Sequence, residues 1–161
     1  MGTMLTGEEQ AAVAGYSQGR YRLINACLRG EEPDLATVWP EISHIDSAVS
    51  KAVIDREMTF YRGLDGEAVA AIFRAGLRIG QVISDEGFAS TSSEAKVARR
   101  FSALMAGGLL MEIRAGAGSI ALDLSPYSAY PDEGEFLLAR GVAMRVVGFV
   151  EASRMIQVEL I

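Results

Sequence analysis

Hydrophobic positions in the first third of the chain follow a helical period. The apolar residues recur at roughly three- to four-residue spacing, as at Val13, Tyr16, Tyr21, Ile24 and Leu28. Thr6 and Glu9 form a capping box, in which the hydroxyl and the carboxylate satisfy each other's backbone donors at the start of a helix. Gly30 is a typical stop signal. The pattern therefore predicts a helix that begins after Thr6 and ends at Gly30.

The following segment predicts a connector and then a second helix. Residues 31–40 contain two prolines and Trp39, a composition typical of a connector. Residues 42–55 have Ile45, Val49 and Val53 at four-residue spacing, which predicts a helix there.

The rest of the chain alternates short apolar runs with short helical patterns. Strands are expected over residues 58–62, 87–91, 109–114, 119–124, 135–138, 142–150 and 155–161. Helices are expected over residues 67–75 and from a second capping box at Thr91–Glu94 to about residue 105, and Gly63 is expected to break the first strand. Helices first and strands later indicate an α+β fold with antiparallel sheets. A length of 161 residues favours one domain, with a helical lead-in over about 5–56 and a mixed sheet core over about 57–161.

Two glutamates stand out where a turn runs into an apolar strand. Glu133 and Glu135 are two residues apart, and side chains at that spacing in an extended segment point to the same face. Close carboxylates suppress each other's ionisation, which lets them take different roles. A solvated acidic turn is the alternative, but glutamate is depleted in strands and like charges repel there. The pair is therefore a candidate functional site.

Two more polar clusters precede the glutamates, at residues 60–63 and 87–92. Arg62 could hold a phosphate with two hydrogen bonds, and Gly63 would let a ligand approach the backbone closely. Ser90 could bond a sugar hydroxyl or hold a carboxylate, and Thr91 is expected to cap the next helix. Each cluster alone is commonplace, as a surface ion pair, a helix cap or a hairpin. Together they suggest a nucleotide sugar substrate whose glycosidic bond breaks through a cationic sugar.

Composition excludes several other classes of protein. The formal net charge is −6, from 15 basic and 21 acidic residues, which disfavours nucleic acid as a partner. Cys27 and His44 are the only residues of their types, so the sequence offers no intrachain disulfide and no Cys/His metal site. No apolar run is long enough for a membrane span, and no signal peptide is visible at the N-terminus.

The ordered motifs resemble the arginine–serine–glutamate branch of the mono-ADP-ribosyltransferases, which includes bacterial toxins. The resemblance rests on Tyr61-Arg62-Gly63, on Phe88-Ala89-Ser90-Thr91-Ser92 and on Glu133-Gly134-Glu135. It extends to the N-terminal segment, through Leu5-Thr6-Gly7-Glu8-Glu9, Tyr16, Tyr21, Ile24-Asn25 and Leu28-Arg29. The resemblance implies a split β-sandwich with helices, and NAD as co-substrate with no metal.

The resemblance also implies roles for the residues that would bind NAD. Arg62 would contact the NAD phosphates, and the backbone of Gly63 would hold the nicotinamide carboxamide. Ser90 would support the pocket and orient Glu135, and Phe101 would hold the nicotinamide end. Glu135 would bond the nicotinamide ribose and stabilise the oxocarbenium-like transition state. Tyr61, Thr91 and Ser92 complete the implied NAD-binding set.

On the acceptor side, the resemblance implies that Glu133 positions or deprotonates an arginine guanidinium and that Tyr130 helps to recognise the target. The implied function is transfer of ADP-ribose to an arginine of a target protein. A toxin or effector of this kind would be delivered by a dedicated secretion system into the cytoplasm of a target cell, with an immunity protein or chaperone as a further partner. The alternatives are an NAD glycohydrolase, ADP-ribosylation of nucleic acid, and a non-catalytic binding module.

Overall fold

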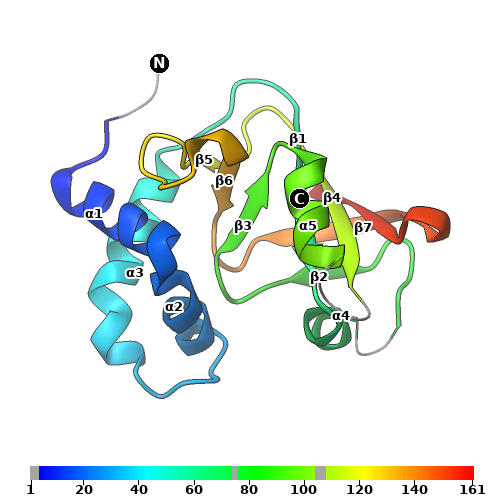
Figure 1. Ribbon diagram of the computed structural model, residues 1–161, viewed down its shortest axis with the longest axis horizontal. Coiled ribbons are helices and arrows are strands. Elements are labelled where there is room, and N and C mark those ends of the chain that lie inside the picture. Colours follow the sequence, from blue (N-terminus) through cyan, green and yellow to red (C-terminus); the bar gives the residue numbers. More distant parts are fainter. Residues whose placement is uncertain (1–3, 74–75, 104–107) are drawn as a thin grey trace.

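The computed structural model describes residues 4–73, 76–103 and 108–161 (Figure 1). The helices are α1 (Gly7–Gly15), α2 (Tyr21–Leu28), α3 (Leu35–Ser50), α4 (Gly66–Ile72) and α5 (Ala95–Ala103). The strands are β1 (Met58–Leu64), β2 (Val82–Ser84), β3 (Ala89–Ser92), β4 (Leu109–Ala115), β5 (Leu122–Asp123), β6 (Glu135–Leu138), β7 (Ala143–Val150) and β8 (Met155–Leu160). No helix in the described ranges is long and apolar enough to cross a membrane.

The predicted first helix begins where expected but is not continuous. Thr6 caps α1: its Oγ1 accepts a hydrogen bond of 3.2 Å from the backbone N–H of Glu9, and its own N–H donates to Oε1 of Glu9 at 2.9 Å. A π-helical turn, Tyr16–Arg20, then separates α1 from α2. Gly19 within it has φ 139°, a conformation that favours glycine and redirects the chain.

The prediction of a connector over residues 31–40 is correct only for residues 31–34, because α3 already begins at Leu35. Val38 is fully buried and extends the apolar repeat that continues through Ile42 and Ile45. Burial of this apolar face outweighs the unfavourable helix propensity of Pro40. The helix ends at Ser50, earlier than expected.

The strands in the described residues form one sheet in the order β2-β7-β8-β4-β1-β3-β6-β5. Among these described strands, only β4 and β8 pair in parallel. The sheet separates between β1 and β3: β1 pairs with β4 along its whole length but with β3 only at Tyr61 and Ser92. Gly63 does not break β1, because it pairs with Leu110 of β4. The very short β2 was not predicted.

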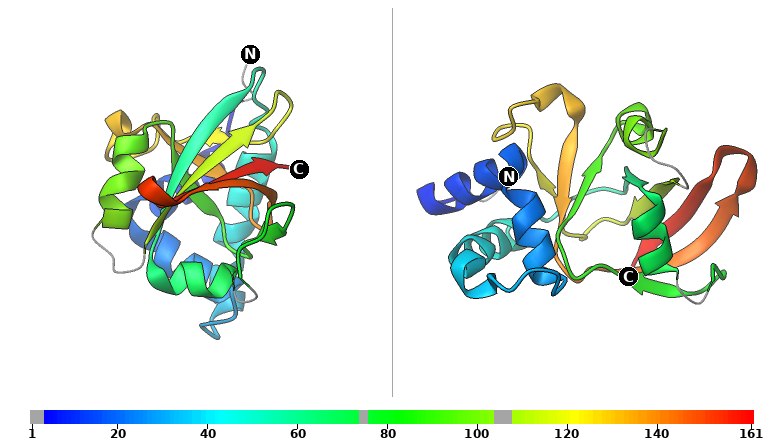
Figure 2. Two further views of the ribbon diagram at one scale, coloured as in Figure 1. Left: turned by 90° about the vertical axis from the view of Figure 1, so that its right-hand side faces the viewer. Right: turned by 60° about the horizontal axis from the view of Figure 1, so that its bottom comes forward.

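Alternation along β6 places the β3-β6-β5 half between two cores. Leu137 packs in the first core with residues of α1, α2 and α3, and Leu138 packs in the second core with residues of β1 and β4. The three helices gather on one side of the molecule, and β7 and β8 lie on the other (Figures 1 and 2). This arrangement confirms the predicted α+β fold with N-terminal helices and a split β-sandwich.

The hydrogen bonds before α5 differ from the predicted capping box at Thr91–Glu94. Thr91 lies within β3, where its hydroxyl donates to the carbonyl of Phe136 at 2.8 Å, so it does not cap. Ser92 instead accepts a hydrogen bond of 2.9 Å from the backbone N–H of Glu94 just before α5. The hydroxyl of Thr91 therefore ties β3 to β6.

Candidate active site

Strand register brings the three sequence motifs together where the sheet separates. Ser92 of β3 is the pairing partner of Tyr61 on one side and of Glu135 on the other. A cavity of about 450 Å³ opens there, between this region of the sheet and the helical layer. Of the predicted site residues, it is lined by Tyr61, Arg62, Gly63, Ser90, Thr91, Ser92, Tyr130, Glu133 and Glu135. Phe101 belongs to α5, and its side chain lies outside the described residues.

Hydrogen bonds from two serines hold the carboxylate of Glu135. Ser90 Oγ donates to Oε2 at 2.5 Å, and Ser17 Oγ, from the π-helical turn, donates to Oε1 at 3.4 Å. Burial raises the pKa of Glu135 above its usual value, the two serine hydrogen bonds oppose that rise, and the charge of Glu133 adds to it. The charge of Glu133 thus raises the pKa of Glu135 in the predicted direction, but burial is the larger cause.

Glu133 and Glu135 do not lie on one extended strand, so the predicted geometry of the pair is wrong. Glu133 ends a 3₁₀ turn, Pro131–Glu133, and Gly134 has the left-handed conformation φ 58°, ψ 40°. Ser92 Oγ donates to the carbonyl of Glu133 at 2.6 Å, and the N–H of Ser93 donates to the carbonyl of Gly134 at 2.9 Å. A tight, tethered turn therefore places both carboxylates in one cavity.

Arg62 is a mostly buried cation with an unused donor. Its side chain is 19% exposed, and its Nη2 lies 3.3 Å from Oδ2 of Asp85. Its Nη1 is buried and has no hydrogen-bond partner in the described part of the chain. Burial lowers the pKa of Arg62, and the charge of Asp85 opposes that effect, yet a guanidinium stays protonated at neutral pH. An uncompensated buried donor of this kind suits an anionic ligand.

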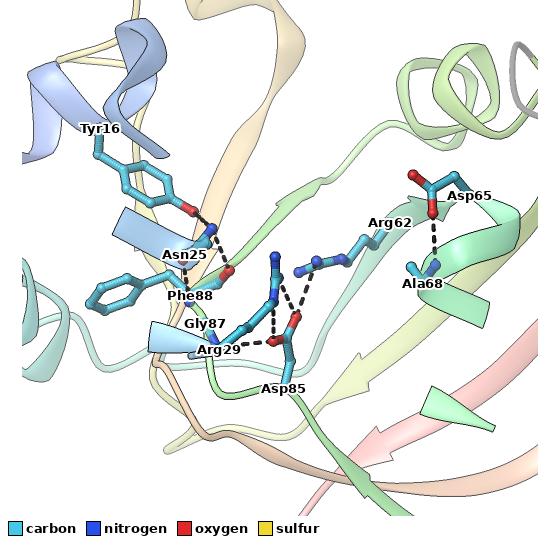
Figure 3. Close-up of polar contacts among 9 residues, drawn as sticks. All are labelled: Tyr16, Asn25, Arg29, Arg62, Asp65, Ala68, Asp85, Gly87 and Phe88. Carbon is cyan, nitrogen blue, oxygen red and sulfur yellow. Dashed lines mark hydrogen bonds and ion pairs between the residues drawn. The ribbon is translucent and has the colours of Figure 1, made fainter. Parts of the chain in front are cut away.

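The helical layer supplies cavity residues to which sequence reasoning gave no role. They are Tyr16, Ser17, Tyr21, Asn25 and Arg29. The buried Asn25 accepts a hydrogen bond of 2.9 Å from the N–H of Phe88 and donates to the carbonyl of Phe88 at 3.4 Å and to the hydroxyl of Tyr16 at 3.1 Å (Figure 3). Asn25 thereby fixes the strand that leads to Ser90. An asparagine in an otherwise apolar stretch of a predicted helix is the sequence signal that could have indicated this role of Asn25.

The packing of the helical layer shifts the pKa values of Tyr16 and Asp85. Burial raises the pKa of Tyr16 to about 12, and its hydroxyl accepts the hydrogen bond from Asn25. Asp85, which was also missed, bonds both Arg29 and Arg62, and these contacts with the N–H of Gly87 outweigh the effect of burial and lower its pKa. Among the described residues, no cluster of three potential metal ligands occurs.

Comparisons with known proteins agree with this geometry. A family model described as ADP-ribosyltransferase exoenzyme matches residues 1–160. A Mycobacterium avium protein named as an NAD(+)–arginine ADP-ribosyltransferase, Mav, is 31% identical over 145 residues, which cover 89% of this chain. Exoenzyme T of Pseudomonas aeruginosa is 31% identical over 150 residues, 86% of this chain. The chain spans only 16% and 28% of the lengths of these two relatives.

Among solved structures, the ADP-ribosyltransferase Vis in complex with agmatine is similar, and Vis is a toxin from Vibrio splendidus. It superposes with a TM-score of 0.77 at 25% identity, covering 99% of this chain and 76% of that chain. The family match over nearly the whole sequence confirms the resemblance seen in the motifs. The chain belongs to the ADP-ribosyltransferase exoenzyme family.

Proposed function

We propose that this chain transfers ADP-ribose from NAD to an arginine of a target protein and releases nicotinamide. One observation supports this most strongly: a single cavity is lined by Arg62, whose Nη1 has no hydrogen-bond partner among the described residues, by Glu135, whose carboxylate two serines hold, and by Glu133. These are the groups needed for a phosphate, for a cationic sugar and for an acceptor. The name of the relative Mav supports the choice of co-substrate and acceptor.

NAD would bind with its phosphates at Arg62, where the free guanidinium donor fits an anion. The backbone of Gly63 would hold the nicotinamide carboxamide, and Phe101 would hold the nicotinamide end. Ser90 would orient Glu135 beside the nicotinamide ribose through its 2.5 Å hydrogen bond. Tyr61, Thr91 and Ser92 would form the adjoining walls, as members of the paired strands β1 and β3.

The reaction then breaks the bond between the ribose C1′ and the nicotinamide nitrogen. The bonding electron pair leaves on that nitrogen, so the pyridinium departs as neutral nicotinamide and needs no acid. The sugar becomes an oxocarbenium-like cation, which the ionised carboxylate of Glu135 stabilises. This carboxylate is preorganised by Ser90 and Ser17 before substrate binds.

The acceptor nitrogen forms the new bond to C1′ and loses a proton. A protonated guanidinium is a poor nucleophile, so it needs an anionic neighbour. Glu133, which lines the same cavity, would accept that proton. Tyr130 is 68% exposed at the edge of the site and would contact the target protein.

Transfer to a guanidinium is tested with NAD labelled on its adenylate half, a cell lysate and agmatine as a minimal acceptor. We expect labelled protein from lysate, labelled agmatine in its presence, and neither product with Glu135→Gln. Mass spectrometry of the lysate identifies the modified residue and the target. Free ADP-ribose, formed at one rate with or without acceptor and with no labelled protein, would instead indicate an NAD glycohydrolase.

We further propose that the chain acts as a toxin or effector domain in the cytoplasm of a target cell, delivered by a dedicated secretion system, and that its producer makes an immunity protein or chaperone for it. The support is its membership of an exoenzyme family. Expression inside a test cell should arrest growth, whereas the Glu135→Gln variant should not. Equal growth with both proteins would contradict a toxic activity in that cell.

A further inference from the structure

Asp85 connects two arginines that come from different parts of the fold. Arg29, the residue that follows α2, binds it with two hydrogen bonds, Nε to Oδ1 at 2.9 Å and Nη2 to Oδ2 at 2.7 Å. Arg62 of β1 donates from Nη2 to Oδ2 at 3.3 Å. Figure 3 shows both guanidinium groups directed at this one carboxylate. Asp85 thus joins the helical layer to the central strand.

The carboxylate is itself held in place. Its Oδ1 accepts a hydrogen bond of 2.9 Å from the backbone N–H of Gly87, two residues along the chain. The side chain of Asp85 is only 13% exposed. A mostly buried carboxylate that bonds both cations offsets their mutual repulsion, which would otherwise drive the guanidinium groups apart.

Arg29 and Arg62 line the candidate active-site cavity. Asp85 is not among the described residues that line it. Asp85 therefore lies behind the guanidinium groups. It engages Nη2 of Arg62 and leaves Nη1 buried without a partner. Because a guanidinium is planar and rigid, fixing one nitrogen also fixes the direction of the other.

From this geometry we propose that Asp85 is a positioning residue for the diphosphate of NAD: it holds Arg29 and Arg62 side by side so that their free donors meet the two phosphate groups. The proposal rests on the NAD-dependent function proposed above. Asp85 touches neither NAD nor the reacting atoms and acts through the two arginines. Its negative charge alone would repel a phosphate, so simple electrostatics predicts the opposite effect of removing it.

The test compares Asp85→Asn with the wild-type chain in calorimetric titrations of NAD and of ADP, which carries the diphosphate alone. We expect both ligands to bind about tenfold more weakly, because the amide cannot satisfy both arginines. Inhibition by nicotinamide should not change, and the Michaelis constant for NAD should rise with kcat altered by less than about twofold. A general loss of structure would also weaken inhibition by nicotinamide and lower kcat.

Two further variants sharpen the test. Glu86→Gln removes the same charge from the exposed neighbour of Asp85 and should leave ADP affinity unchanged. Asp85→Glu keeps the charge but displaces it by one methylene, and it should weaken ADP binding about threefold. If Asp85→Asn does not fold, the Asp85→Glu comparison decides the proposal. When Arg29→Gln is already present, adding Asp85→Asn should weaken ADP binding much less than it does in the wild-type chain.

The possible failures are distinguishable. Unchanged or tighter ADP binding in the Asp85 variants, with a wild-type chain that binds NAD, would overturn the positioning role alone. A wild-type chain that binds neither NAD nor ADP would overturn the proposed function. Equal weakening by Glu86→Gln would show that the loss of affinity is not specific to the position of Asp85, and would also overturn the role assigned to Asp85.

Discussion

Ser90 Oγ donates a hydrogen bond of 2.5 Å to Oε2 of Glu135, linking neighbouring strands β3 and β6. Replacing Ser90 by alanine removes a hydrogen bond to a carboxylate, worth roughly 1.5–3 kcal/mol. Since the carboxylate must be oriented toward the sugar, we expect kcat to fall about 10- to 100-fold. Steady-state kinetics of NAD hydrolysis measures this. Ser84→Ala, at an exposed position of β2, is the matched control and should keep full activity.

The two glutamates should respond differently to loss of charge. Glu135→Gln should abolish both ADP-ribosyl transfer and NAD hydrolysis, because it removes the anion that stabilises the cationic sugar. Glu133→Gln should lose transfer by at least about 100-fold but keep part of the hydrolysis, because water does not require deprotonation of a guanidinium. Labelled transfer to agmatine and release of nicotinamide report the two activities separately. Equal loss of both in both variants would show that the roles are not separable.

Acidification should abolish the proposed activity at a higher pH than the pKa of an ordinary glutamate implies. The folded-state pKa of Glu135 is raised, chiefly by burial, so its carboxylate is lost as pH falls through that raised value. Ser17→Ala removes a hydrogen bond that favours the ionised form, and should move the acid limb of kcat/KM further up in pH. Glu133→Gln, assayed by NAD hydrolysis, should move it down. If the acid limb of kcat/KM shifted in neither variant, that limb would report the ionisation of a group other than Glu135.

Arg62→Lys should weaken NAD binding about tenfold, because lysine has no planar fork with which to engage Asp85 and a phosphate together. Calorimetric titration measures the affinity. Arg145→Lys, on the exposed face of β7, retains its charge and serves as the control. Affinity equal to that of the wild type would count against a phosphate contact at Arg62.

Local patterns predicted much of this fold because they depend on neighbours in the sequence. The capping box of Thr6 and Glu9 forms as expected, since three residues suffice to define it. The start of α3 was missed because the burial of Val38 depends on contacts with other elements, which outweigh the local effect of proline. The geometry of Glu133 was missed because the turn at Gly134 depends on tethers from Ser92 and Ser93.

The candidate site likewise contains residues that the sequence identified and residues that only the structure reveals. Arg62, Ser90 and Glu135 stand in recognisable motifs, so the sequence alone identified them as candidates. Asp85 and Arg29 are 56 residues apart, and neither position has a local signal that indicates their ion pair. Their relation requires α2 to pack beside the strands, which becomes visible only in three dimensions.

Gly134 offers the sharpest test of the turn that presents both carboxylates. It has φ 58°, and a Cβ added there would lie 2.4 Å from Ser93 Oγ. Gly134→Ala should therefore shift the turn, lower kcat at least about 10-fold and destabilise the fold by about 1–2 kcal/mol. Gly118→Ala is the matched control, because Gly118 has φ 91° but open space around its Cβ position.

Thermal unfolding and kinetics of the two variants distinguish strain in the glycine backbone from displacement of the turn that presents the carboxylates. Both should lose about 1 kcal/mol from the left-handed backbone conformation, which corresponds to a fall in Tm of about 2–4 °C. Only Gly134→Ala should also lose activity, because only there does the new methyl group meet a side chain that borders the site. If both variants lost stability equally and both kept wild-type kcat, the tight turn at Gly134 would not be what places Glu133 and Glu135 for catalysis.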